Sequence, residues 1–104
     1  MDKETIKIAK NFANKLKKVL GVEKIILFGS RARGDFFKKS DFDFVIVSKK
    51  FEGIPVILRM SVLYDYWNEA VDIEALCCTP EEFNRRKNSA SILRKAIKGG
   101  IELW

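Results

Sequence analysis

The stretch KIILFGSRARGDFFKKSDFDFVIV, residues 24–47, contains two apolar runs on either side of a polar segment. The first run, residues 24–28, is too short for a helix and is rich in β-branched side chains, so we expect a buried central strand. Residues 29–34 follow as a turn or short helix, and residues 35–40 as a loop. The second run, residues 42–47, predicts another strand, so this stretch supplies the centre of a small sheet.

The periodicity of apolar residues predicts the elements on both sides of this centre. In the segment before residue 24, lysines and apolar residues lie on opposite faces of a predicted helix. In the segments after residue 47, a proline stands near the start of each of two predicted helices. The further elements that we expect are a helix over residues 3–20, a helix over 54–68, a strand over 71–77, helical structure over 79–98 with a break near 88–89, and a short edge strand over 101–104. This order predicts one domain over residues 1–104 with an α/β (α+β) fold, in which a small mixed β-sheet has helices packed on one side.

The composition limits the function classes. Of the 104 residues, 20 are basic and 14 acidic, and the net charge of +6 favours anionic partners such as nucleotides, nucleic acid or an acidic protein surface. The absence of histidine excludes His-dependent triads and His-bearing zinc sites. Cys77 and Cys78 are adjacent, and we expect two half-buried residues at a strand end. No apolar run approaches the roughly 20 residues of a membrane span, and residues 1–10 lack a signal-peptide core, so we expect a cytoplasmic protein with no membrane partner.

Two carboxylates stand at the start of the second predicted strand. Asp41 and Asp43 are two residues apart, so their side chains point to the same face, whereas Phe42 and Phe44 point into the core. Carboxylates this close repel each other unless a cation lies between them. Oxygen ligands without His or Cys suit Mg²⁺, or alternatively Mn²⁺. On its own, an Asp-x-Asp pair is also typical of a solvated junction between a loop and a strand.

A third carboxylate, Asp72, is expected inside the third predicted strand, between Val71 and Ile73. A charge at such a position is costly unless it pairs with a basic side chain or binds metal. If this strand lies beside the strand of Asp43, three carboxylates can hold two metal ions, and Asp72 is placed to accept the proton of an attacking hydroxyl. Glu74 would share the face of Asp72, either behind the metal ligands or merely exposed.

The Gly29-Ser30 dipeptide supplies groups that suit a phosphate. Gly29 has no Cβ, so a phosphate can approach the backbone closely. Ser30 opens a helical turn with free N–H groups, and its hydroxyl can donate to the same phosphate. Arg33, three residues on, lies on the same face of that turn and can add a charged hydrogen bond, unless it pairs with a nearby aspartate.

The pattern of Gly-Ser, ten residues, Asp-x-Asp and a later lone Asp resembles the polymerase-β-type nucleotidyltransferase superfamily. The string FGSRARGDFFKKSDFDFVIV closely resembles its smallest branch, the prokaryotic minimal nucleotidyltransferases (MNT), and the resemblance extends from about residue 22 to the C-terminus. The family implies two Mg²⁺ ions and transfer of a nucleoside monophosphate from an NTP to a hydroxyl, with loss of pyrophosphate. By position, the resemblance implies metal-binding and catalytic roles for Asp41, Asp43 and Asp72, and triphosphate contacts for Gly29, Ser30, Arg33 and Ser40.

The minimal branch often acts as the antitoxin that is paired with a helical HEPN-type ribonuclease, and there it transfers AMP from ATP to a tyrosine of the toxin. The resemblance therefore implies an MntA-like antitoxin, a protein adenylyltransferase that binds ATP and a HEPN-family partner. Larger relatives hold the base and the acceptor with a second domain, for which 104 residues leave no room. A partner, or a homo-oligomer, would then supply part of the site.

Two other functions remain open from the sequence. The first is a non-catalytic module that binds nucleotide and neutralises its partner by contact. The second is a transferase that acts on a small molecule such as an aminoglycoside, or on an RNA end, and this function needs an acceptor pocket. Retention of all three aspartates and of Gly-Ser favours the enzyme over the binding module.

Overall fold

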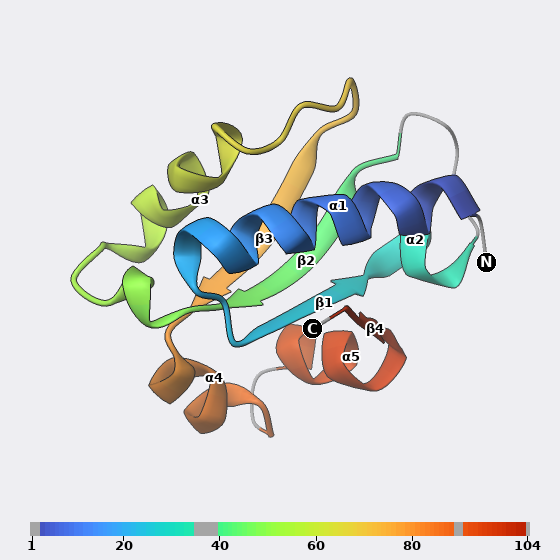
Figure 1. The fold of residues 1–104 in the computed structure, drawn as a ribbon. Helices are drawn as coiled ribbons and strands as arrows, with labels where there is room; N and C mark the ends of the chain where they lie inside the picture. Colours follow the sequence, from blue (N-terminus) through green and yellow to red (C-terminus); the bar gives the residue numbers. More distant parts are fainter. Residues whose placement is uncertain (1–2, 35–39, 89–90, 104) are drawn as a thin grey trace.

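The computed structural model describes residues 3–34, 40–88 and 91–103, and Figure 1 shows its elements. In chain order they are α1 (Lys3–Leu20), β1 (Lys24–Phe28), α2 (Gly29–Arg33), β2 (Phe42–Val47), the 3₁₀ turn η1 (Lys49–Phe51), α3 (Val56–Tyr64), β3 (Ile73–Cys78), α4 (Pro80–Arg86), α5 (Ser91–Gly99) and β4 (Ile101–Glu102). The α/β class that the sequence predicts is confirmed. Within the described part of the chain, no helix combines the length and the apolarity that a bilayer span needs.

The four strands form one mixed sheet in the order β3-β2-β1-β4. Strand β1 is antiparallel to both β2 and β4, whereas β2 is parallel to β3. The short β4 lies at one edge, as its length suggests, and β3 lies at the other. The two apolar runs of the sequence, β1 and β2, are therefore the two central strands.

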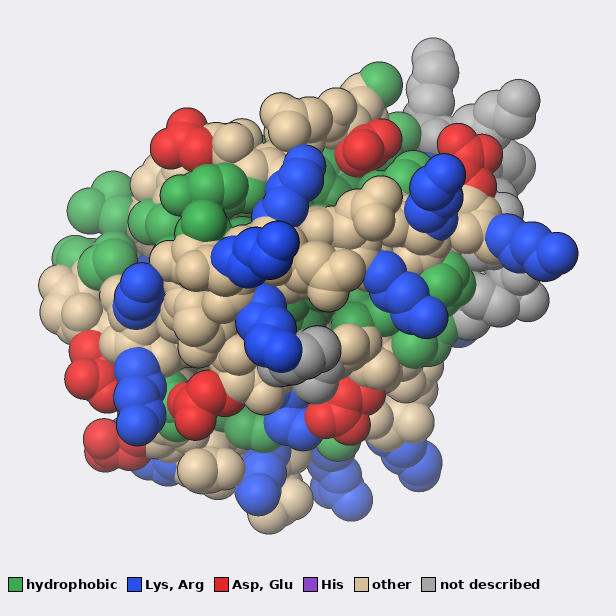
Figure 2. All heavy atoms as spheres, viewed as in Figure 1, with side chains coloured by type: hydrophobic (Ala, Val, Ile, Leu, Met, Phe, Trp, Pro, Cys, Tyr) green, Lys and Arg blue, Asp and Glu red, His purple; other side chains and the backbone are tan. Residues whose placement is uncertain are grey.

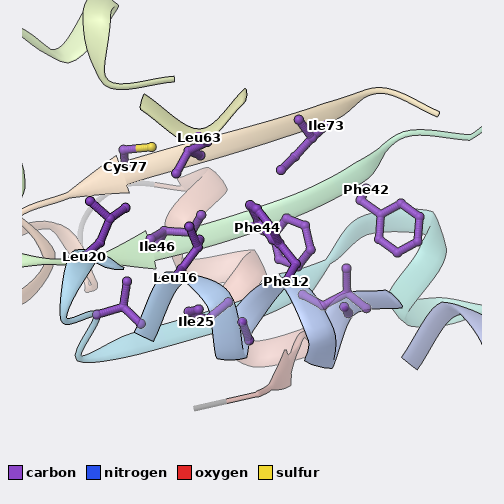
Figure 3. Close-up of a cluster of buried hydrophobic side chains, with 14 of the residues drawn as sticks. Phe12, Leu16, Leu20, Ile25, Phe42, Phe44, Ile46, Leu63, Ile73 and Cys77 are labelled. Atoms are coloured by element: carbon purple, nitrogen blue, oxygen red, sulfur yellow. The ribbon is translucent and has the colours of Figure 1, made fainter. Parts of the chain in front are cut away.

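Helices cover both faces of the sheet, because the central strands are apolar on both faces. On the first face, which we call the α1 face, Phe12 and Leu16 of α1 and Leu63 of α3 pack against the sheet (Figure 3). On the opposite face, the α5 face, Leu93 of α5 and Phe83 of α4 pack against a second apolar cluster. The helices are thus not confined to one side of the sheet.

Two elements are shorter than their sequence pattern indicates. Helix α3 ends at Tyr64 rather than near residue 68, and β3 begins at Ile73 rather than at residue 71. Trp67 explains the difference, since its ring packs 5.0 Å from the ring of Phe12 and its Nε1 donates a hydrogen bond to the Val71 carbonyl at 2.8 Å. Burying this indole turns the chain away from the helical path.

The start of α4 and the end of β3 agree with the sequence. The Thr79 hydroxyl accepts from the Glu82 N–H at 3.2 Å, and the Glu82 carboxylate accepts from the Thr79 N–H at 2.9 Å, which completes a capping box. Cys77 and Cys78 are free thiols at the end of β3, as the sequence predicts, but both are buried rather than half-buried. Burial raises the pKa of Cys77 to about 12, so this thiol is not a reactive nucleophile. Helical structure ends at Arg86 and resumes in α5, although residues 89–90 of the expected break lie outside the described residues.

Candidate active site

The turn from β1 into α2 brings the backbone against a carboxylate. Gly29 has a φ of +76°, and a Cβ atom at this position would lie 2.4 Å from Oδ2 of Asp43. Antiparallel pairing causes this approach, because the register sets Phe28 opposite Asp43. Only glycine combines this backbone conformation with this contact.

Asp41 and Asp43 lie on one side of β2, as the period of a strand predicts. Phe42 and Phe44 are fully buried on the α1 face, so Asp43 points to the α5 face. Both aspartates are half-buried. The pKa of Asp43 is raised, first by burial and then by the negative charges of Glu74 and Asp41, while Arg33 acts in the opposite direction.

The parallel pairing of β2 and β3 brings further carboxylates to the same edge. The register sets Asp43 beside Glu74, and the Phe42 N–H donates to the Asp72 carbonyl at 3.0 Å, which holds Asp72 at the level of Asp41. The prediction that Asp72 lies inside an apolar strand is wrong: it precedes β3 and its side chain is exposed. Its carboxylate therefore remains in contact with solvent, and Asp72 joins the site through strand order alone.

These side chains line one cleft of about 580 Å³. The acidic side chains that line the cleft are Asp41, Asp43, Asp72 and Glu74. The edge strand β3 forms the rest of this side with residues 73–76, and Phe28 of β1 also contacts the cleft. Met60 and Tyr64 of α3 form an apolar wall. The cleft thus has an acidic side and an apolar side.

A divalent cation fits the donors in this cleft, although no complete cage is present. Within the described residues, no three Asp, Glu, Cys or His side chains are already grouped closely enough to hold a metal ion. Mg²⁺ does not need such a cage, because it is commonly held by one or two carboxylates together with substrate phosphates. Asp41 and Asp43 provide that pair, and their mutual repulsion, which contributes to the raised pKa of Asp43, is what a cation would relieve.

The predicted phosphate-binding residues border the carboxylates from the side of α2. Ser30 is in the first turn of α2, and its carbonyl accepts from the Gly34 N–H at 2.9 Å. Arg33 is exposed and close enough to Asp43 for its charge to lower the pKa of that carboxyl. Ser40 directly precedes Asp41 and is half-buried. Asp35 and Lys38–Lys39, which the sequence places in the loop before the site, lie outside the described residues.

Arg31 is a residue of this region that the sequence pattern did not single out. It is only 6% exposed, and its guanidinium lies 4.4 Å from the centre of the Phe42 ring. Its Nε donates to the Ser40 carbonyl at 3.1 Å, and its Nη1 donates to the Thr5 hydroxyl at 3.1 Å. Arg31 and Arg33 are two residues apart on a short helix, so their side chains must point to different sides. This spacing is the sequence feature that could have indicated different roles for the two arginines.

Known proteins support the interpretation of this geometry. The family model for the nucleotidyltransferase domain matches residues 6–99. A relative from Methanocaldococcus jannaschii, named "Putative protein adenylyltransferase MJ0604", is 40% identical over 100 residues, which cover 94% of this chain and 96% of the relative. The crystal structure of a "putative nucleotidyltransferase" from Sulfolobus solfataricus superposes with a TM-score of 0.66 at 25% identity and covers 97% of this chain and 80% of that chain.

A further structure, described as a toxin-antitoxin with AMP-PNP, superposes with a TM-score of 0.54 at 20% identity, covering 91% of this chain and 72% of that chain. At this identity the likeness shows the fold alone. The family model, by contrast, spans most of the chain, and the M. jannaschii relative matches nearly end to end. The chain therefore belongs to the nucleotidyltransferase family and is a minimal nucleotidyltransferase, a transferase enzyme.

Proposed function

We propose that this protein transfers AMP from ATP to a hydroxyl of a partner protein in a Mg²⁺-dependent reaction. The observation that carries the proposal is the cleft that Asp41, Asp43 and Asp72 line beside the Gly29-Ser30 turn. The resemblance to minimal nucleotidyltransferases makes a tyrosine of a HEPN-family toxin the expected acceptor, with this chain acting as its antitoxin.

The residues divide the reaction between them. Asp41 and Asp43 would hold Mg²⁺, which when bound stabilises the charge on the phosphates. Ser30 and Arg33 would hold the triphosphate from the side of α2, with Ser40 near the metal ligands. The acceptor oxygen forms a bond to the α-phosphorus, the bond to the β-phosphate oxygen breaks, and pyrophosphate leaves. Asp72 is exposed at the open side of the cleft, where it can accept the hydroxyl proton.

A protein acceptor is supported by the relatives and by the openness of the cleft. The M. jannaschii relative carries the name of a protein adenylyltransferase and has almost the same length. The cleft is open, so an acceptor group must be positioned by a molecule that brings its own surface. The toxin-antitoxin structure shares the fold, and this likeness is a reason to test a toxin as the first acceptor.

A nucleotide-binding module without catalysis is the second candidate. It is favoured by one observation, the lack of a three-ligand metal group among the described residues. In that function the protein would neutralise its partner by contact, and the carboxylates would at most bind Mg²⁺–ATP.

One experiment separates the two candidates. The purified protein is incubated with α-labelled ATP, Mg²⁺ and the product of the adjacent gene, in parallel with an Asp41→Ala/Asp43→Ala double variant. The enzyme predicts label on the partner with the wild type and none with the variant. Equally tight partner binding by both proteins, without label in either reaction, would support the binding module instead. Labelled aminoglycoside or RNA in place of labelled protein would identify a different acceptor class.

A further inference from the structure

Helix α3 has an inverted distribution of side chains. A surface helix normally buries apolar residues and exposes charged ones. In α3 the guanidinium of Arg59 is buried, with 5% of the residue exposed, while Ile57 on the outer side is 85% exposed. Ile57, Ser61 and Tyr64 follow the spacing of one helical stripe, which lies opposite the stripe of Arg59 and Leu63.

The exposed apolar side chains of the described residues are concentrated on this helix. Of the six large hydrophobic side chains that are exposed there, four belong to α3: Val56, Ile57, Leu58 and Tyr64. Figure 2 shows hydrophobic side chains gathered at the surface over α3, whereas Lys and Arg dominate the surface over α1. Several large apolar side chains exposed together on one helix indicate that a second surface covers them.

The apolar surface is continuous with the active-site cleft. Met60 and Tyr64 line the same cleft as Asp72 and Glu74. A molecule seated on α3 would therefore have its nearest groups at the open side of the cleft, next to Asp72. The triphosphate side, with Ser30 and α2, lies across the carboxylates from α3.

The segment that follows Arg59 in the sequence is acidic, in contrast to the basic chain as a whole. Residues 60–84 contain six acidic side chains and no Lys or Arg, although the whole chain has a net charge of +6. Asp65 and Glu69 lie exposed in the segment that joins α3 to β3. A partner with basic side chains complements this region, whereas the phosphates of an RNA are repelled from it.

We propose that the α3 surface docks the acceptor protein, and that the acceptor presents its hydroxyl from an apolar patch flanked by Lys or Arg side chains. The α3 surface is defined by Val56, Ile57, Leu58, Tyr64, Asp65 and Glu69. This inference rests on the proposed function and adds the chemistry of the partner to it. Apolar contact provides the affinity, and the acidic rim selects a basic partner and orients it towards Asp72.

The test uses random copolymers of Lys and Tyr and of Glu and Tyr as probes. Their dissociation constants are measured by calorimetry without ATP, and transfer of AMP from labelled ATP is measured separately. We expect the Lys copolymer to bind at least roughly tenfold more tightly, with a preference that weakens as salt is added. A preference for the Glu copolymer, or for an oligoribonucleotide, would overturn the inference.

Matched variants test whether binding depends on the position of the acidic side chains or only on the net charge of the protein. Asp65→Lys/Glu69→Lys changes the rim of α3, and Glu23→Lys/Glu52→Lys makes the same change in net charge at exposed positions elsewhere. We expect the first pair to weaken binding of the Lys copolymer by roughly 2- to 10-fold more than the second. Equal effects would show that only net charge matters and would overturn the docking surface.

The apolar part has its own pair of variants. Ile57→Ser removes a contact side chain of the α3 surface, and Val19→Ser makes a comparable change on α1. We expect only Ile57→Ser to weaken binding of the Lys copolymer. If binding depends on the α3 surface but neither copolymer receives AMP, the result contradicts the proposed function and supports the docking surface. If AMP is transferred but no α3 variant affects it, the surface fails while the function stands.

Discussion

Gly29 and Asp43 lie so close that a Cβ on the glycine would be 2.4 Å from Oδ2 of the aspartate. Gly29 is at the end of the first central strand and Asp43 near the start of the second, so the antiparallel register of the sheet determines this contact. The same register therefore positions both the turn that we propose to bind phosphate and the carboxylate that we propose to bind metal.

We predict that Gly29→Ala displaces Asp43 and lowers kcat/KM for nucleotidyl transfer by at least roughly 100-fold. Gly34→Ala is the control, because Gly34 also has a positive φ, +84°, but no atom of the described residues lies within 4 Å of its Cβ position. Both variants should lose about 1–2 kcal/mol of stability from the backbone conformation. Equal losses of activity in the two variants would contradict a specific contact with Asp43.

We predict that Arg31→Lys lowers the affinity for Mn²⁺, used as a probe for Mg²⁺, by about 10- to 100-fold. Lysine cannot donate to the Ser40 carbonyl and the Thr5 hydroxyl while stacking on Phe42, so the backbone before Asp41 loses its anchor. Mn²⁺ binding is measured by electron paramagnetic resonance well below the unfolding temperature.

The control for Arg31 is Arg59→Lys, which changes another buried arginine whose acceptors, the Ile54 and Cys77 carbonyls and the Glu82 carboxylate, do not line the cleft. It should lower the Tm without altering Mn²⁺ affinity. If Arg31 contributes to stability alone, both variants should lower the Tm and neither should alter the affinity for Mn²⁺.

We predict that Asp43→Asn raises the Tm of the metal-free protein at neutral pH and abolishes activity. The pKa of Asp43 is raised in the folded state by burial and by Glu74 and Asp41. The folded protein thus holds this proton more tightly than the unfolded chain, so ionisation of Asp43 costs stability as pH rises through the window above its ordinary value. The Tm difference between variant and wild type should shrink in acid and on addition of Mg²⁺. A difference independent of pH would contradict this explanation.

We predict that Glu82→Gln destabilises the protein by about 2–3 kcal/mol at pH 7. Hydrogen bonds from buried Arg59 lower the pKa of Glu82 to about 2. A lowered pKa stabilises the fold above the ordinary value of 4.5, and this contribution is lost as pH falls towards 2. Urea unfolding at pH 7 and pH 3 measures the loss.

Glu81→Gln is the control, since Glu81 pairs with Arg85 at the surface and should change stability by less than about 0.5 kcal/mol. If both substitutions have the same small effect, the ion pair between α3 and α4 does not support the fold as we describe.

The sequence by itself determined the local part of this protein. The period of two along residues 41–47 fixes Asp41 and Asp43 on one face and Phe42 and Phe44 on the other, and the run at residues 24–28 requires burial. The capping box of Thr79 and Glu82 is equally local. These features follow from steric rules that act over a few residues, so they need no knowledge of distant neighbours.

Only the tertiary structure decided which distant groups meet. Asp72 reaches the cleft because β3 pairs in parallel with β2, and the same register sets Glu74 beside Asp43. The burial of Arg31 and the exposure of Ile57 depend on which side of a helix contacts the sheet. Strand order and helix orientation are set by the packing of the whole core, and a periodic pattern within one element carries no information about its neighbour.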